Sequence, residues 1–153
     1  MTEVEAIKRT VYEYQHFYNA RRVDDVVDLF TEDGVLRSGN MDLGCEGRDR
    51  IRAFLDSYLG VGDPAAEETS LRPGARVVNP VIELAGDGAT ASVEADFFAL
   101  LWLDGNPHLA SMGRTRYELV REEDRWRIRV LETTVRISKA TMAVLAARTV
   151  TAS

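Results

Sequence analysis

Two tyrosines stand out among the side chains of this sequence that could do chemistry. Tyr14 and Tyr18 are four residues apart, so on a helix their hydroxyl groups lie one turn apart and can reach the same cavity. A buried tyrosine hydroxyl needs a hydrogen-bond partner, and a carbonyl or phenolate oxygen of a small molecule would serve. The alternative is that both are core residues whose hydroxyl groups lie at the rim or bind the backbone.

His108 is a candidate general acid or base, because imidazole titrates near neutral pH. It lies in the turn-like segment Asp104–His108, close to where a cavity would open. The alternative is a solvated loop histidine without a chemical role. His16, in contrast, lies off the apolar side of the first helix, and we expect it to be exposed.

Two carboxylates occur in strongly apolar stretches. Asp96 lies within the run Val93–Leu103, where a charge is out of place unless it is paired or functional. Strand alternation equally allows Asp96 to face solvent or a subunit interface. Glu132 follows Trp126 and Ile128 at even spacing, which predicts that it points inward if no bulge intervenes. An inward Glu132 would be either a desolvated base or half of a buried ion pair.

Several other kinds of site lack support in the sequence. It contains no phosphate-binding loop, no dinucleotide-binding glycine pattern and no Cys/His cluster with metal-ligand spacing. The serines lie outside any nucleophile-elbow pattern. We therefore expect no cofactor and no metal.

Composition favours a compact globular protein. The 153 residues are 45% hydrophobic and 29% charged, which argues against disorder, and the net charge of −6 disfavours nucleic acid or an anionic membrane as a partner. No apolar run approaches the roughly 18 residues that span a bilayer, and the N-terminus lacks signal-peptide features. The sole cysteine, Cys45, is compatible with a reducing cytoplasm. We expect a single cytoplasmic domain over residues 1–153.

The N-terminal part is predicted to be mainly helical. Thr2 followed by Glu5 is the signature of a helix capping box. The expected elements, in order, are a helix ending near Asn19, a short helix from Asp24 or Asp25 to Phe30, a strand over 35–38, an exposed loop over 39–47 and a helix over 48–59.

Strands are predicted for most of the remaining chain, after an irregular crossing over 60–74. They cover 76–84, 89–104 and a hairpin over 113–130, and a closing strand over 134–147 would run into a helix. Helices followed by a strand meander predict the α+β class. We expect a cone-shaped α+β barrel, with three N-terminal helices on a strongly curved, mostly antiparallel sheet that encloses one pocket. A C-terminal extension would begin at about residue 136.

This order of elements, together with segments 18–30, 47–54 and 79–90 and the Trp126 hairpin, resembles the nuclear transport factor 2-like superfamily. The resemblance is closest to its SnoaL-like branch. Members include polyketide cyclases, scytalone dehydratase, ketosteroid isomerase, dehydrochlorinases, dioxygenase β subunits and pure binding modules. The resemblance therefore implies the fold and leaves the function open across these classes.

The resemblance does not bring the isomerase's proton-transferring residues with it. The general-base aspartate of ketosteroid isomerase corresponds to Ser38, and its oxyanion-hole aspartate falls near Arg116. Its oxyanion tyrosine resembles Tyr14. Because a serine is too weak a base to take a proton from carbon near neutral pH, simple ketosteroid isomerisation is not expected.

The dyad of the dehydratases is also missing. The tyrosine and aspartate at the end of their first helix resemble Tyr18 and Asn19, and their histidine falls near Ala75. Asn19 can bind a ligand by hydrogen bonds, but it carries no charge to polarise a histidine.

The leading hypothesis is a cofactor-independent cyclase, dehydratase or isomerase that acts on a small, largely apolar, oxygenated molecule, such as a polyketide intermediate in specialised metabolism. Tyr14 and Tyr18 would donate hydrogen bonds, and Glu132, Asp96 or His108 would move a proton. If none of those three faces the cavity, confinement of the substrate alone would drive the reaction. Residues expected to bind the substrate are Asn19, Ser38, Phe54, Tyr58, Arg116 and Tyr117.

The alternative function is a non-catalytic one, either a ligand carrier or an accessory subunit like a dioxygenase β chain. The missing dyad favours it, and the tyrosine-bearing pocket favours the enzyme. A homodimer is expected in either case, because Phe98, Leu100 and Trp102 would place apolar side chains on the outward face of the sheet.

Overall fold

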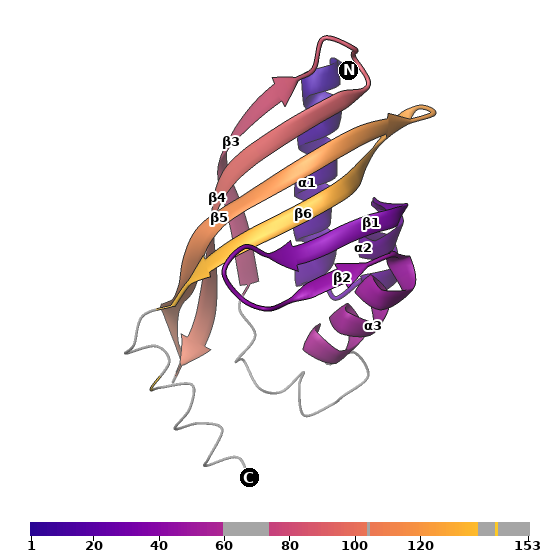
Figure 1. Cartoon of the computed structure of the whole chain (residues 1–153). Coiled ribbons are helices and arrows are strands. Elements are labelled where there is room, and N and C mark those ends of the chain that lie inside the picture. The colour runs from indigo at the N-terminus through magenta and orange to yellow at the C-terminus, as the bar shows by residue number, and fades with distance from the viewer. Residues whose placement is uncertain (60–73, 104, 138–142, 144–153) are drawn as a thin grey trace.

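Six strands form one curved sheet, and three helices accompany it (Figure 1). The computed structural model describes residues 1–59, 74–103, 105–137 and 143, without the side chains of 101–103. The elements within this part of the chain are α1 (Glu3–Asn19), α2 (Val23–Asp28), β1 (Phe30–Ser38), β2 (Gly44–Glu46), α3 (Arg48–Leu59), β3 (Gly74–Leu84), β4 (Thr90–Leu103), β5 (Asn106–Glu122) and β6 (Arg125–Arg136).

The strand order is β2-β1-β6-β5-β4-β3, and the sheet is open. Only the β1–β6 pairing is parallel among the described strands, and the others are antiparallel. Helix α1 crosses one face of the sheet, while α2 and α3 lie beside β1 and β2 (Figure 1). The predicted α+β class with a curved, mostly antiparallel sheet is confirmed.

Local signals in the sequence place α1. The Thr2 hydroxyl accepts a hydrogen bond from the Glu5 backbone N–H at 3.2 Å, and the Glu5 carboxylate accepts one from the Thr2 N–H at 2.7 Å. This is the predicted capping box. Ile7, Val11 and Tyr14 then recur at helical spacing and are buried against the sheet. Helix α3 has the predicted bounds.

Two predictions about the β1–β2 region were wrong. The short helix was expected to reach Phe30, but α2 ends at Asp28, and β1 already begins at Phe30, which pairs with Ile128. The segment 39–47 was expected to be a loop, but it contains β2, whose Cys45 is buried opposite Leu36. In both places strand pairing overrides the local pattern, with the distant strand β6 for Phe30 and with the neighbouring strand β1 for Cys45.

Register shifts account for the curvature of the sheet. Each of the three antiparallel pairings among the long strands contains one, between Val78 and Val81, between Ala99 and Leu100, and between Glu118 and Leu119. A bulge bends its strand and increases the local twist. Three bends in neighbouring strands hollow the face that α1 covers.

The remaining fold predictions fall mainly outside the described residues. These are residues 60–73 of the irregular crossing and most of the closing segment beyond residue 137. The separate strand expected from residue 134 was wrong, because β6 continues to Arg136. Among the described helices, none combines the length and the apolar character needed to cross a membrane.

Candidate functional site

A cavity of about 400 Å³ lies between α1, α3 and the concave face of the sheet. Helices contribute Tyr14, Gln15, Tyr18, Phe54, Leu55 and Tyr58 to its lining, and the β1–β2 segment contributes Leu36, Arg37, Ser38, Met41 and Leu43. The other strands and the residue after β6 contribute Ala75, Val77, Phe97, Ala99, Ala110, Ser111, Thr115, Tyr117, Thr133, Val135 and Ile137. The lining is mostly apolar, and its polar groups are mainly hydroxyls. Such a cavity suits a small, mostly apolar molecule with a few oxygen atoms.

Tyr14 is the centre of an aromatic cluster on one wall of the cavity. Its ring stacks on that of Tyr18 at 5.9 Å between centroids, and it packs edge-on against Phe30 and Tyr117, each at 6.1 Å. Packing on three sides holds the Tyr14 ring in one orientation. Phe54 and Tyr58 stack on each other at 5.4 Å on α3.

The hydroxyl groups of these tyrosines differ in their hydrogen-bond partners. Tyr18 is hydrogen-bonded with Tyr58, and the hydroxyl of Tyr117 is hydrogen-bonded with Thr115. The Tyr14 side chain is only 8% exposed, and within the described part of the chain its hydroxyl has no hydrogen-bond partner. A buried hydroxyl without a protein partner requires water or a ligand atom.

Burial raises the pKa of Tyr14, Tyr18 and Tyr117 above the ordinary value for tyrosine, because the phenolate would lose its hydration. Neighbouring tyrosines raise the pKa of Tyr14 further, and Tyr58 does the same for Tyr18. These groups therefore keep their protons at neutral pH. They can donate hydrogen bonds to a ligand, but they are unsuited to act as bases.

The buried tyrosines also predict how stability depends on pH. The pKa of tyrosine in the unfolded chain is about 10. Because the folded-state pKa of Tyr14 is raised above that value, its contribution is complete below pH about 10 and is lost as the pH rises through the folded value. Urea unfolding at about pH 9 and about pH 11 should show a smaller drop in the free energy of unfolding for Tyr14→Phe than for wild type. Tyr12→Phe, at an exposed position of the same helix, is the control and should leave the drop unchanged.

The prediction that Glu132 points inward was wrong, because the bulge does intervene. Glu118 pairs with Val130 and Leu119 pairs with Ile128, so Arg129 is an extra residue in β6. Inward positions therefore change from even numbers (Trp126, Ile128) to odd numbers (Leu131, Thr133, Val135). Glu132 faces the other side of the sheet, where its carboxylate pairs with Arg37 at 2.7 Å.

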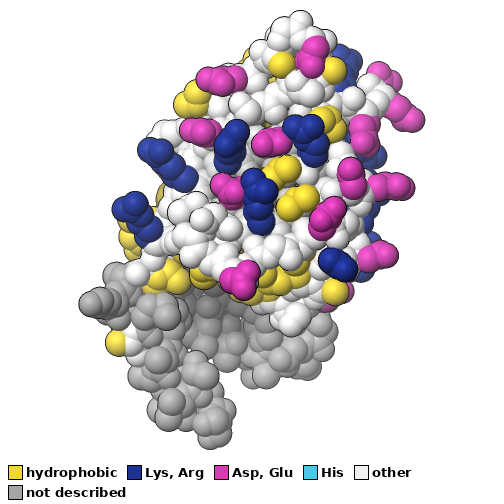
Figure 2. Space-filling model, viewed as in Figure 1, with side chains coloured by type: hydrophobic (Ala, Val, Ile, Leu, Met, Phe, Trp, Pro, Cys, Tyr) yellow, Lys and Arg dark blue, Asp and Glu magenta, His cyan; other side chains and the backbone are white. Residues whose placement is uncertain are grey.

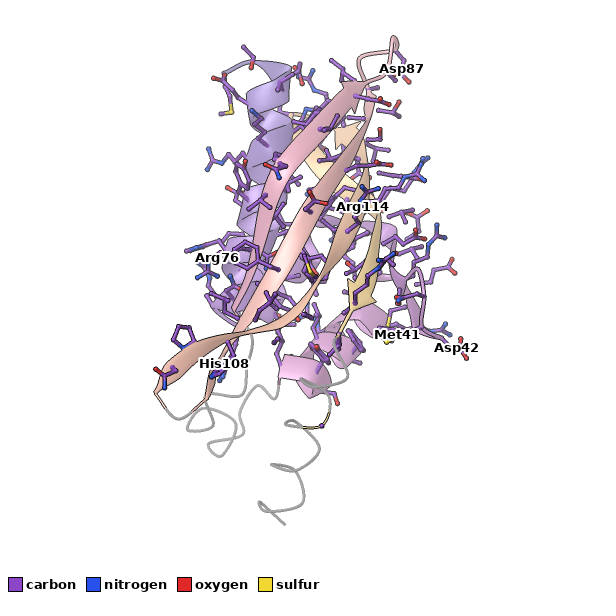
Figure 3. The ribbon with its side chains drawn as sticks, turned by 90° about the vertical axis from the view of Figure 1, so that its left-hand side faces the viewer. Met41, Asp42, Arg76, Asp87, His108 and Arg114 are labelled. Atoms are coloured by element: carbon purple, nitrogen blue, oxygen red, sulfur yellow. The ribbon has the colours of Figure 1, made fainter. Side chains whose placement is uncertain are left out.

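Three further candidates also lie away from the cavity. Asp96 is exposed and lies 3.7 Å from Arg114, its cross-strand partner, and Arg116 is exposed on the same outer face. His108 was expected in a turn, but it belongs to β5, is exposed and pairs with Leu101. Figure 3 shows it on the side of the molecule opposite to Met41, which lines the cavity.

The side chain of Asn19 is hydrogen-bonded to the backbone of another element. Its side-chain amide donates to the Ala75 carbonyl oxygen at 2.8 Å and accepts from the Ala75 N–H at 3.0 Å. These two bonds join the end of α1 to the beginning of β3. Asn19 does not line the cavity.

Four other residues expected to bind a substrate do line the cavity, namely Ser38, Phe54, Tyr58 and Tyr117. The Ser38 hydroxyl also accepts a hydrogen bond from the Met41 N–H at 3.1 Å, and this bond holds the turn that leads to β2. Tyr58 is exposed at the edge of the cavity. Their role in binding stays a prediction.

Sequence reasoning missed two threonines of the cavity wall. Thr115 is buried on β5, and a buried hydroxyl in a strand of alternating pattern was a signal that could have found it. Thr133 is inward only because of the bulge at Arg129, and the residue types alone do not reveal a bulge. No group of His, Cys, Asp and Glu side chains arranged to hold a metal occurs among the described residues.

Solved structures share this architecture. An NTF2-like protein with a cystatin-like fold from Novosphingobium aromaticivorans is 17% identical, with 94% of this chain and 88% of that one covered and a TM-score of 0.73. A putative scytalone dehydratase from the same species is 17% identical, with 88% and 85% covered and a TM-score of 0.68. ActVI-ORFA from Streptomyces coelicolor is 18% identical, with 86% and 96% covered and a TM-score of 0.65. At these identities the likeness concerns the fold.

The family follows from the sequence itself. Comparison with functionally curated proteins yields no match. The SnoaL-like domain family matches residues 1–132, which include α1 to α3, β1 to β5 and the first part of β6. These elements build the curved sheet and most of the cavity wall. The chain belongs to the SnoaL-like domain family.

Proposed function

We propose that this protein binds a small, largely apolar, oxygenated molecule in the tyrosine-lined cavity and acts on it without a cofactor. The observation that carries the proposal is the Tyr14 hydroxyl, which is buried at the cavity wall with no hydrogen-bond partner in the described part of the chain. A ligand carbonyl oxygen that accepts this hydrogen bond would satisfy it. The fold shared with a putative scytalone dehydratase and with ActVI-ORFA agrees with such a role.

Cyclisation, with dehydration after it, fits the cavity better than isomerisation. Isomerisation through a carbon acid needs a general base, and neither a carboxylate nor an imidazole lines the described part of the cavity. A chain with several carbonyl groups, such as a polyketide intermediate, enolises in part by itself. Its ring closes when the enol carbon attacks a carbonyl group, and the enol proton ends on the new hydroxyl group. For this reaction the protein needs only to confine the substrate and to polarise one of its carbonyl groups.

The cavity wall offers groups suited to both of these contributions. Apolar walls such as Leu55, Phe97 and Val135 would fold a flexible chain and exclude water. The Tyr14 hydroxyl, which keeps its proton because burial raises its pKa, would donate to the oxygen on which negative charge develops. Its position on the first helix resembles that of the oxyanion tyrosine of ketosteroid isomerase.

A non-catalytic ligand carrier is the second candidate. It is favoured by the same absence of a carboxylate or imidazole from the described cavity lining. The carrier and the cyclase would bind the same kind of ligand, but only the cyclase would convert it. A carrier would return its ligand unchanged, whereas a cyclase would release a cyclic isomer or its dehydrated product.

The test compares Tyr14→Phe with Tyr12→Phe. The probes are 1-naphthol for binding and a synthetic linear polyketone for turnover followed by mass spectrometry. Losing one hydrogen bond should weaken 1-naphthol binding by about 2- to 10-fold in Tyr14→Phe and should slow ring closure by at least about 10-fold. Tyr12→Phe, altered on the exposed side of α1, should match wild type.

Equal affinity of wild type and Tyr14→Phe for 1-naphthol would contradict the proposed ligand site. Tight binding of the polyketone without any conversion by wild type would support the carrier instead.

A further inference from the structure

Three residues with hydroxyl groups lie next to one another across the strand wall of the cavity. Thr115 on β5 pairs in register with Thr133 on β6, and Thr133 pairs with Ser38 on β1. All three line the cavity, and we call them the hydroxyl row. Residues paired across neighbouring strands share a face of the sheet, with their Cβ atoms about 5 Å apart. The hydroxyl row is therefore a line of polar groups at nearly regular spacing.

Mainly apolar rows flank the hydroxyl row on both sides. In register with one another, they contain Phe97, Gly113 and Val135 on one side and Val93, Tyr117 and Leu131 on the other. Strand alternation sends the charged residues next to the threonines, such as Arg116 and Glu132, to the outer face of the sheet. Figure 2 shows basic and acidic side chains interspersed on that face. Any oxygen atom of a ligand on this wall must therefore meet the hydroxyl row.

The hydroxyl groups of the row differ in how far they are already engaged. Ser38 accepts a hydrogen bond from the Met41 N–H at 3.1 Å and donates one to the side-chain oxygen of Asn40 at 3.3 Å, so the turn before β2 takes up this hydroxyl. The Thr133 hydroxyl has no hydrogen-bond partner within the described part of the chain. Thr133 is therefore available to a ligand.

Thr115 and Tyr117 together hold one unused proton. Their side chains are only 5% and 1% exposed, and their hydroxyl groups share one hydrogen bond. Two hydroxyl protons and one bond leave one proton without an acceptor in the described part of the chain, whichever group donates. A buried donor of this kind requires water or a ligand atom. The Tyr117 ring packs edge-on against Tyr14, so this pair adjoins the Tyr14 side chain.

We infer that the ligand bears two oxygen atoms meta to each other on a ring, and that Thr133 selects for the second of them. The first oxygen binds at Tyr14 and the Thr115–Tyr117 pair, and the second binds the Thr133 hydroxyl. The inference rests on the proposed function and gives its ligand a definite pattern of oxygen atoms.

The spacing of the two threonines is the reason for the meta pattern. Meta oxygens of an aromatic ring are about 5 Å apart, which matches side chains paired across neighbouring strands, and both C–O bonds point toward the same wall. Ortho oxygens lie much closer together, and para oxygens point in opposite directions. A ring closed from a chain with carbonyl groups on alternate carbons bears its oxygens meta to one another, which agrees with the proposed cyclisation.

Thr133 would also reject ligands that lack the second oxygen. A ring in the cavity separates the Thr133 hydroxyl from water, and a ligand without an oxygen at that place leaves the hydroxyl unpaired. A site built to pair a ligand oxygen discriminates in this way because an unpaired buried polar group is costly.

The test compares three ligands by isothermal titration calorimetry. 1-Naphthol carries one hydroxyl, 1,3-dihydroxynaphthalene adds a second one meta to it, and 1,5-dihydroxynaphthalene adds it pointing away. Wild type should bind the 1,3 isomer about 3- to 10-fold more tightly than 1-naphthol, and the 1,5 isomer no more tightly.

Thr133→Val keeps the shape of the side chain and removes its hydroxyl. It should lose the preference for the 1,3 isomer and bind 1-naphthol as wild type does. Thr134→Val makes the same substitution at the next residue, which faces the outer side of the sheet, and should keep the preference. Thr115→Val should weaken both ligands equally, by about 2- to 10-fold, because it acts on the first oxygen.

Circular dichroism of each variant verifies that it is folded. Equal binding of the 1,3 and 1,5 isomers by wild type would overturn the inference, while binding of 1-naphthol that depends on Tyr14 would still support the proposed function. A folded Thr133→Val that keeps the preference would overturn the role of Thr133. Absence of binding of all three compounds to wild type would contradict the proposed function and this inference together.

Discussion

Deleting Arg129 is expected to lower the free energy of unfolding by more than about 4 kcal/mol. Arg129 is the extra residue that changes the inward positions of β6 from even to odd numbers. Without it, either the Trp126–Ile128 part or the Leu131–Val135 part of the strand would turn its apolar side chains to solvent. Loss of one buried large side chain costs about 2–5 kcal/mol, and the deletion affects at least two.

Arg129→Ala is the matched control, because it keeps the residue count of β6 and removes only the side chain. That side chain forms an exposed ion pair with Glu118 at 2.9 Å, and such pairs contribute about 0–1 kcal/mol. Guanidinium unfolding monitored by tryptophan fluorescence measures both variants. A deletion variant as stable as Arg129→Ala would show that the bulge does not set the register of β6.

Filling the cavity through Ala99→Phe should abolish ligand binding. Ala99 is buried on β4, lines the cavity and follows the inward-facing positions Ala95 and Phe97. A phenyl ring added at this position would occupy space that the ligand needs. We expect at least about 100-fold weaker binding of 1-naphthol by isothermal titration calorimetry, with stability changed by no more than about 1–3 kcal/mol.

The control is Ala53→Phe, which adds the same ring at an exposed position of α3. It should bind 1-naphthol as wild type does. Full affinity in folded Ala99→Phe would mean that the ligand occupies another site, and the proposed function would then lose its structural basis.

Much of the fold could be predicted because its signals are local. The capping box at Thr2 and the spacing of Ile7, Val11 and Tyr14 define α1 within a few turns of chain. The bounds of α3 and the alternation in the long strands are equally local. The tyrosines of α1 were predicted to face a cavity for the same reason, since helical spacing determines which residues share a side of a helix.

The predicted proton-transferring residues lie elsewhere because their placement depends on how the strands pair. Arg129, the one extra residue in β6, turns Glu132 to the outer face. Strand pairing places Asp96 beside Arg114 and His108 beside Leu101. Asn19 was expected to bind a substrate. Its side chain instead forms two hydrogen bonds with the backbone of Ala75, 56 positions later in the chain.

The sequence by itself determined α1, α3, most of the long strands, the family and the aromatic character of the cavity, because these follow from residue types and short spacings. Only the tertiary structure decided which polar groups the cavity contains. A side chain in a strand points to one face or the other according to register, and register is set by pairing between segments that are far apart in the chain. For that reason Glu132 lies on the outer face, and the described cavity wall contains hydroxyl groups in place of the expected carboxylate.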